Sequence, residues 1–218
     1  SDYRTWEHQL PVFAEHFRGI AYSRRYHYPN AQVTSSADYT FTRHARDLSD
    51  FMTELDLRDV HLVGSSYGAY VGLLAALEKP DRFRTLVLCE PPVIPLLVSD
   101  PENPLQALWL LLRDFSTGRS FLKFGIKAMD PAKKQLEKDN LEEGVRLFTN
   151  GVLGKGGFER LPAEARAAAL DNAPALKAEL LGPGFPSGFP QEKARRLDLP
   201  VLLVEAAKSP AFFHAISD

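Results

Sequence analysis

Two short apolar runs flank a helical stretch within the first ninety residues. Val60–Gly64 and Phe83–Cys89 are β-rich, and the second run is apolar on both faces, as is typical of a central parallel strand. Between them, Tyr67–Glu78 is apolar nearly all round, so we expect a buried helix that ends before Lys79-Pro80. A strand, a helix and a strand in this order predict a parallel sheet with crossover helices, which is an α/β fold.

Predicted helices and strands also occur on both sides of this stretch. Trp6, Leu10, Phe13 and Phe17 recur at helical spacing and predict one helix, which Pro11 kinks or restricts to its later part. The remaining predicted core elements are a strand near 19–23, a helix from Ala45 to Leu57 and a strand over Leu199–Val204.

From about Pro91 the pattern becomes helical for nearly a hundred residues. A helical block between two sheet strands predicts an inserted cap, so we divide the chain into a core over 1–95, a helical cap over 96–195 and a returning core strand and helix over 196–218. A loop rich in glycine and proline over 182–190 closes the cap. The predicted cap helices are Leu105–Phe115, Phe121–Met129, Pro131–Phe148 and Pro162–Leu181.

Composition narrows the classes of partner. The 218 residues carry a formal net charge of −2, which gives no reason to expect nucleic acid or an anionic membrane surface. No apolar run approaches the length needed to cross a membrane, and neither a leader peptide nor a metal-binding spacing of Cys and His is visible. A single cysteine, Cys89, fits a reducing compartment. We therefore expect a cytoplasmic protein that acts on a small-molecule substrate without a cofactor; the pattern does not decide its oligomeric state.

The segment Gly64-Ser65-Ser66-Tyr67-Gly68 matches the pattern G-x-S-x-G. It follows a predicted strand and opens a predicted helix, which is the context that a nucleophile elbow requires. We expect glycines at both ends to avoid Cβ clashes in the tight turn. Ser66 would then stand above the sheet as the nucleophile, and the helix dipole with the Tyr67 backbone N–H would stabilise an oxyanion.

The run HLVGSSYGAYVGLLAALEKPDRFRTLVLCEPP resembles the centre of the α/β-hydrolase superfamily. The segment RTWEHQLPVFAEHF is similar to the helix that follows this family's oxyanion strand, and LPVLLVEAAKSPAFFHAISD is similar to the strand and helix that follow its cap. The resemblance implies an α/β-hydrolase fold and a triad of serine, acid and histidine. Serine rather than aspartate at position 66 argues against the dehalogenase and epoxide-hydrolase members, which attack through a carboxylate.

The resemblance leaves two candidates for the acid. Many members carry an aspartate a few residues after the strand that follows the cap, where this chain has Ser209. Other members, certain haloalkane dehalogenases among them, place the acid after the strand that follows the elbow helix, which is the position of Glu90. We favour Glu90, because it ends a central strand on the site face of the sheet, and keep Glu205 as the alternative.

The family's histidine would follow a strand and a helix beyond Asp218, and its HG oxyanion loop would precede Ser1, so we expect a chain that lacks a stretch of the fold at each end. His27 is the one histidine that the pattern places in a loop on the site side, as a pocket wall or substitute base. The predicted function is hydrolysis of an ester or related acyl bond through an acyl-enzyme. The alternatives are a protein that binds small molecules without turnover and an inactive fragment.

Overall fold

The computed structural model describes residues 2–101 and 103–218. Its contacts divide the chain into two compact units. The core unit consists of Thr40–Phe124 with Phe185–Asp218, and the helical unit consists of Ser1–Tyr39 with Gly125–Gly184. These bounds differ from the expected division at 95 and 196, because the first two helices after Pro91 pack within the core unit and the N-terminal segment packs within the helical unit.

The core unit is built on a parallel sheet in the order β1-β2-β3. Its strands are β1 (Val60–Ser65), β2 (Phe83–Cys89) and β3 (Val201–Val204), so the predicted parallel α/β arrangement is confirmed for these elements. The register pairs Ser65 with Cys89 and Cys89 with Val204, and the three strands therefore end at one edge. Residues that leave those ends meet where open parallel sheets place their ligand sites.

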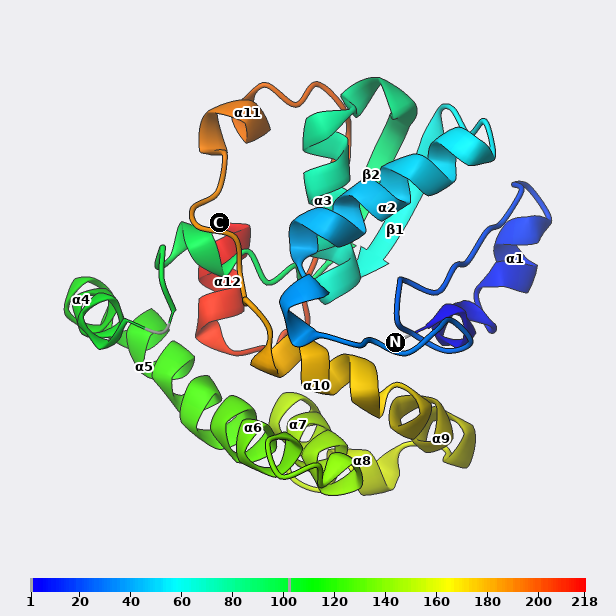
Figure 1. Ribbon diagram of the computed structural model, residues 1–218. Coiled ribbons are helices and arrows are strands. Elements are labelled where there is room, and N and C mark those ends of the chain that lie inside the picture. The colour runs from blue at the N-terminus through cyan, green and yellow to red at the C-terminus, as the bar shows by residue number, and fades with distance from the viewer. Residues whose placement is uncertain (1, 102) are drawn as a thin grey trace. The chain divides into compact units, whose positions relative to one another are not determined.

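Helices α2 (Phe41–Glu54) and α3 (Tyr67–Glu78) pack on each other, and α3 packs on β1 and β2 (Figure 1). The bounds of α3 agree with those predicted for a helix apolar all round, and most of its residues are buried. Thr40 is the N-cap of α2, since its hydroxyl accepts the Arg43 backbone N–H at 3.1 Å. The other helices of this unit are α4 (Pro104–Arg113), α5 (Phe115–Phe124), α11 (Gln191–Arg195) and α12 (Ala211–Ser217).

The helical unit packs around a small apolar cluster of Val145, Phe158 and Ala173. A buried polar contact anchors its first residues, because Asn172 donates to the Asp2 carboxylate at 2.6 Å. Asn172 also accepts the Tyr28 backbone N–H at 3.0 Å, and it thus joins two segments of the unit. The helices are α1 (Leu10–Ala14), α6 (Asp130–Leu136), α7 (Leu141–Leu153), α8 (Gly157–Arg160), α9 (Ala163–Asp171) and α10 (Ala173–Leu181), with a π-helical segment over Gly125–Met129.

Several predicted elements differ from the structure. The helix predicted over Pro162–Leu181 is divided at Asn172 into α9 and α10, and the helix predicted over Phe121–Met129 is the end of α5 followed by the π-helical segment. The long N-terminal helix is a 3₁₀ turn (Tyr3–Trp6) followed by the five-residue α1, which buries no residue and has Pro11 in its first turn. A helix without a buried face has little to stabilise it over a longer span. Residues 19–23 do not form a strand in the structure. The helix predicted over Pro131–Phe148 is interrupted by a turn in which Asp139 has φ 59°.

Among the described residues, no helix combines the length and the apolar composition needed to span a membrane.

Candidate functional site

Ser66 occupies a strained turn between β1 and α3. Its backbone has φ 50° and ψ −124°, a conformation that costs a non-glycine residue roughly 1–3 kcal/mol. The turn is held by three hydrogen bonds: the Ser66 N–H donates to the Cys89 carbonyl at 2.8 Å, and the Ser66 carbonyl accepts the N–H groups of Ala69 at 2.9 Å and Tyr70 at 3.2 Å. The side chain of Ser66 is exposed. The structure therefore has the strained geometry and accessibility that the sequence motif predicts for a nucleophile elbow.

The two glycines of the motif are not equivalent. A Cβ at Gly64 would lie 2.7 Å from the Ala69 Cα and 2.9 Å from both the Ala69 nitrogen and the Gly68 oxygen. All three are backbone atoms, so no small side-chain movement can relieve the contact. A Cβ at Gly68 would meet nothing within 4 Å. The expectation that both glycines are needed for clearance is thus correct for Gly64 and wrong for Gly68.

Tyr67 is the first residue of α3, so its backbone N–H lies at the positive end of the helix dipole beside Ser66. Its side chain is buried and stacks on the Phe41 ring, with 3.9 Å between the ring centroids. The His44 ring lies 5.5 Å from the Tyr67 ring, and His44 is itself buried. The spacing of His44 from Phe41 and Leu48 places it on the buried face of α2.

Glu90 leaves the end of β2 with φ 49°, a second strained position beside the elbow. Its N–H donates to the Val204 carbonyl at 2.9 Å. Its carboxylate atom Oε1 accepts the Ala206 backbone N–H at 3.2 Å and also accepts a hydrogen bond from the Ser209 hydroxyl. The structure thus brings Glu90 to Ser209, the position at which the sequence comparison expected an aspartate. Burial and the neighbouring Glu90 charge raise the pKa of the Cys89 thiol.

Glu205, the alternative acid, has a different partner. One of its carboxylate oxygens lies 2.8 Å from His214 Nδ1, and both side chains are about one-third exposed. This contact raises the pKa of the His214 imidazole above its ordinary value, because the carboxylate stabilises the protonated ring. The two candidate acids therefore follow neighbouring strands but are held by different groups.

The register of the sheet places Ser66 and Glu90 at the same edge. Ser65 pairs with Cys89 across the ladder, so Ser66 and Glu90 are the residues that directly follow a matched pair on neighbouring strands. The hydrogen bond from the Ser66 N–H to the Cys89 carbonyl ties the two turns together. A hydroxyl and a carboxylate at the carboxyl ends of adjacent parallel strands can act on one bound molecule.

No hydrogen bond to the Ser66 hydroxyl is formed by the residues that the structure describes. Of the core-unit histidines, His61 contacts the Thr85 hydroxyl at 2.8 Å, and His214 contacts Glu205. His44 lies against the Tyr67 ring. A base for Ser66 is therefore not among these contacts.

His27 belongs to the helical unit. Its Nε2 lies 3.1 Å from an Arg24 guanidinium nitrogen and 3.3 Å from the Tyr39 hydroxyl, whose oxygen is 3.0 Å from Glu179. A guanidinium can only donate, so in the contact with Arg24 the His27 Nε2 is the acceptor. This arrangement favours a structural role for His27 within the helical unit over that of a base.

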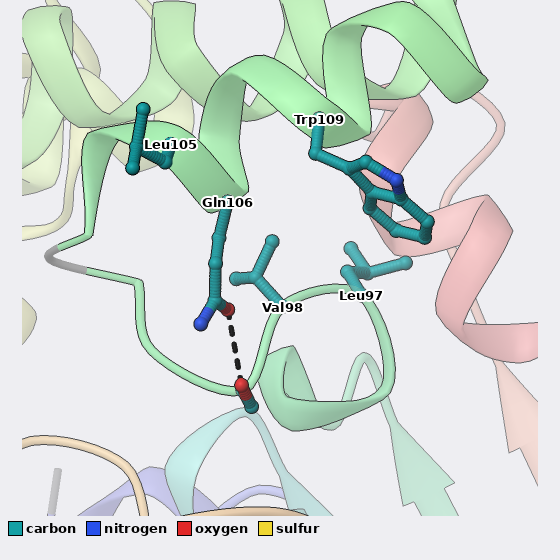
Figure 2. A pocket seen from close by; sticks show the side chains of 6 residues that line it. Leu97, Val98, Leu105, Gln106 and Trp109 are labelled. Atoms are coloured by element: carbon teal, nitrogen blue, oxygen red, sulfur yellow. Dashed lines mark hydrogen bonds between the residues drawn. The ribbon is translucent and has the colours of Figure 1, made fainter.

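The aromatic residues that follow β2 serve different purposes. Phe121 and Phe124 pack on Phe212 of α12, and their ring centroids lie 5.8 Å and 5.3 Å from that of Phe212. Trp109 instead lines a hollow in the core unit (Figure 2). Phe115 is 68% exposed. Within the described residues, no group of three or more His, Cys, Asp or Glu side chains is arranged to hold a metal ion.

Comparison with known proteins places these features in a family. A family sequence model described as alpha/beta hydrolase fold matches residues 1–217. The non-heme chloroperoxidase CPO-A1 of Kitasatospora aureofaciens is 36% identical over 105 residues, which cover 45% of this chain and 36% of that protein. The chain thus aligns with about a third of the length of this curated relative.

Solved structures share the fold at low sequence identity. A bromoperoxidase from Bacillus anthracis matches with a TM-score of 0.66 at 19% identity, covering 97% of this chain and 73% of that one. The carboxylesterase CesB from Bacillus subtilis matches with a TM-score of 0.60 at 18% identity, covering 93% and 61%. At these sequence identities the structural similarity shows the fold alone.

Proposed function

Because the chain belongs to the alpha/beta hydrolase fold family, we propose that it acts as a serine hydrolase on an ester or related acyl bond of a small, largely apolar substrate. The observation that carries the proposal is the backbone of Ser66, which is strained at φ 50° and ψ −124° while its side chain is exposed. Strain of this kind persists only where the surrounding structure holds it, and it clusters at active sites.

In the proposed reaction, the Ser66 hydroxyl attacks the acyl carbonyl carbon and transfers its proton to a base. The carbonyl oxygen becomes an oxyanion beside the Tyr67 backbone N–H and the positive end of α3. The carbon–oxygen bond to the leaving group breaks, and the leaving alcohol takes up the proton. Water then attacks the acyl-enzyme, releases the acid and restores the Ser66 hydroxyl.

We propose Glu90 as the acid that orients the base. Its carboxylate accepts two hydrogen bonds, from the Ala206 N–H and the Ser209 hydroxyl, and is therefore fixed in direction. Such support is what a carboxylate needs in order to hold an imidazolium in one orientation. Glu205 is the weaker candidate, because its carboxylate already pairs with His214 at 2.8 Å.

The test is covalent labelling with a fluorophosphonate, followed by intact mass and peptide mapping. We expect one adduct, at Ser66, that Ser66→Ala abolishes. Ser65→Ala is the matched control, since Ser65 is an exposed neighbour in the same motif and should leave labelling intact. An adduct elsewhere, or none at all, would contradict an activated serine in this chain. If Ser66 reacts, His27→Gln asks whether His27 supplies the base, and unchanged labelling assigns the base to another group.

A second function, binding of a small molecule without turnover, is favoured by one observation. The structure shows no histidine hydrogen-bonded to the Ser66 hydroxyl among the described residues, and without a base a serine hydroxyl is a weak nucleophile. Saturable binding of an uncleaved ester together with the absence of a fluorophosphonate adduct would select this function over hydrolysis.

A further inference from the structure

A hollow of about 330 Å³ lies between α4 and the loop that precedes it, within the core unit (Figure 2). This volume is near the lower end of the range for small-molecule sites in proteins. Its walls are largely apolar, and two of them are strongly exposed, Leu105 at 72% and Trp109 at 54%. The lining residues are Leu97, Val98, Ser99, Leu105, Gln106 and Trp109.

Gln106 is held in one orientation by two hydrogen bonds. Its Oε1 accepts the Asp100 backbone N–H at 2.9 Å and the Ser99 hydroxyl at 3.1 Å, the second of which is drawn in Figure 2. A backbone N–H can only donate, so the atom that faces it is the oxygen, and the amide is not flipped. The Nε2 group therefore presents its two hydrogens elsewhere, and no acceptor for them is found among the described residues.

Trp109 supplies a flat wall. The Arg113 guanidinium carbon lies 5.2 Å from the centroid of the Trp109 ring, and this cation–π contact restrains the ring. No charged side chain belongs to the lining, so a buried ion would lose hydration without finding a partner in the lining itself. The hollow thus combines apolar walls, one aromatic face and one oriented amide donor.

We propose that this hollow binds a small, uncharged, flat apolar molecule that carries a carbonyl oxygen. The ring of the ligand covers the exposed Trp109 and Leu105 side chains, and its carbonyl oxygen accepts a hydrogen bond from Gln106 Nε2. Burial of apolar surface supplies the attraction, and the amide selects for the oxygen. The site uses neither Ser66 nor Glu90, so this proposal is independent of hydrolysis.

The experiment follows the indole N–H resonances of the ¹⁵N-tryptophan-labelled chain. Only Trp6 and Trp109 contribute, and Trp6→Phe assigns the two signals. The probe is acetophenone, and its control is α-methylstyrene, an analogue of similar size in which a methylene group replaces the oxygen. We expect acetophenone to shift the Trp109 signal saturably and to leave the Trp6 signal in place. The analogue should bind about fivefold more weakly, as the loss of one hydrogen bond implies.

Two variants separate recognition of the carbonyl oxygen from nonspecific apolar binding. Gln106→Leu should abolish the preference for acetophenone, so that the two probes bind alike. Leu112→Ala, on the same helix but outside the hollow, should leave both affinities and their ratio unchanged. Signal dispersion in each spectrum reports whether the variant is folded. The proposal is overturned if Trp109 shows no saturable shift in the folded wild-type chain, or if the preference survives Gln106→Leu.

A comparison with Ser66→Ala keeps the two proposals apart. Because the hollow does not include Ser66, this variant should bind acetophenone as the wild type does. The hydrolase proposal fails on the fluorophosphonate adduct, whereas the binding proposal fails on the Trp109 signal, and neither result decides the other.

Discussion

The elbow makes a quantitative prediction from two glycines in one motif. Gly64→Ala and Gly68→Ala add the same methyl group four residues apart. At position 64 that carbon would lie 2.7–2.9 Å from three backbone atoms of α3, where ordinary contact is 3.4–4 Å. Relief requires the start of α3 to move away from β1 by several tenths of an ångström or more. Overpacking against backbone typically costs about 1–3 kcal/mol and sometimes more, so we expect Gly64→Ala to destabilise the protein by roughly 3 kcal/mol.

The same methyl at position 68 enters open space within a helix. Replacing a helical glycine by alanine stabilises by roughly 0.5–1 kcal/mol, so the two variants should differ by about 4 kcal/mol in the free energy of unfolding. Urea unfolding followed by far-ultraviolet circular dichroism measures the difference. Two variants within about 1 kcal/mol of each other would refute the close approach of β1 and α3, and with it the turn that presents Ser66.

Three further predictions concern buried or charged side chains outside the elbow. Tyr70→Phe should leave stability unchanged or raise it by up to about 1 kcal/mol in urea unfolding, because the buried Tyr70 hydroxyl has no hydrogen-bond partner among the described residues. Glu205→Gln should lower the pKa of His214 in an NMR titration, because Glu205 raises that pKa. The pair therefore stabilises the fold while His214 is protonated, and this contribution is lost as the pH rises through the folded-state pKa. Asn172→Ala should cost about 2 kcal/mol in the free energy of unfolding, because the buried Asp2 carboxylate loses a donor at 2.6 Å. Burial acts to raise the pKa of Asp2, but its hydrogen bonds outweigh burial and lower that pKa, so the cost should shrink as acid protonates Asp2. A cost that did not shrink in acid would contradict this assignment.

Local chemistry explains why one part of the fold was predictable. The bounds of α3 and β2 agree with those predicted, and β1 extends the predicted strand by one residue. Each is marked by an uninterrupted apolar pattern and by a breaker at its end, such as Lys79-Pro80 after α3. By contrast, no residue of α1 is buried, and residues 19–23, where a strand was predicted, have no regular secondary structure. A sequence pattern indicates which secondary structure a segment prefers, and tertiary packing decides whether that structure forms.

The candidate site shows the same division. The strained turn at Ser66 was predictable because its motif is local and its strand and helix are contiguous with it. The contact between Glu90 and Ser209 joins residues 119 positions apart and depends on the pairing of β2 with β3, which no local pattern specifies. Sequence comparison placed both residues near the acid, but only the sheet register brings the hydroxyl of Ser209 to the carboxylate of Glu90.

This contact explains why a serine is compatible with Glu90 at that place. The Ser209 hydroxyl donates to the Glu90 carboxylate, whereas an aspartate at 209 would bring a second negative charge into hydrogen-bonding distance of the first. Two carboxylates so close cannot both ionise near neutral pH without a large penalty. An aspartate at position 209 would therefore be unfavourable beside Glu90. In this chain Glu90 is the carboxylate that follows β2, and the loop after β3 contributes two hydrogen-bond donors to it, Ala206 and Ser209.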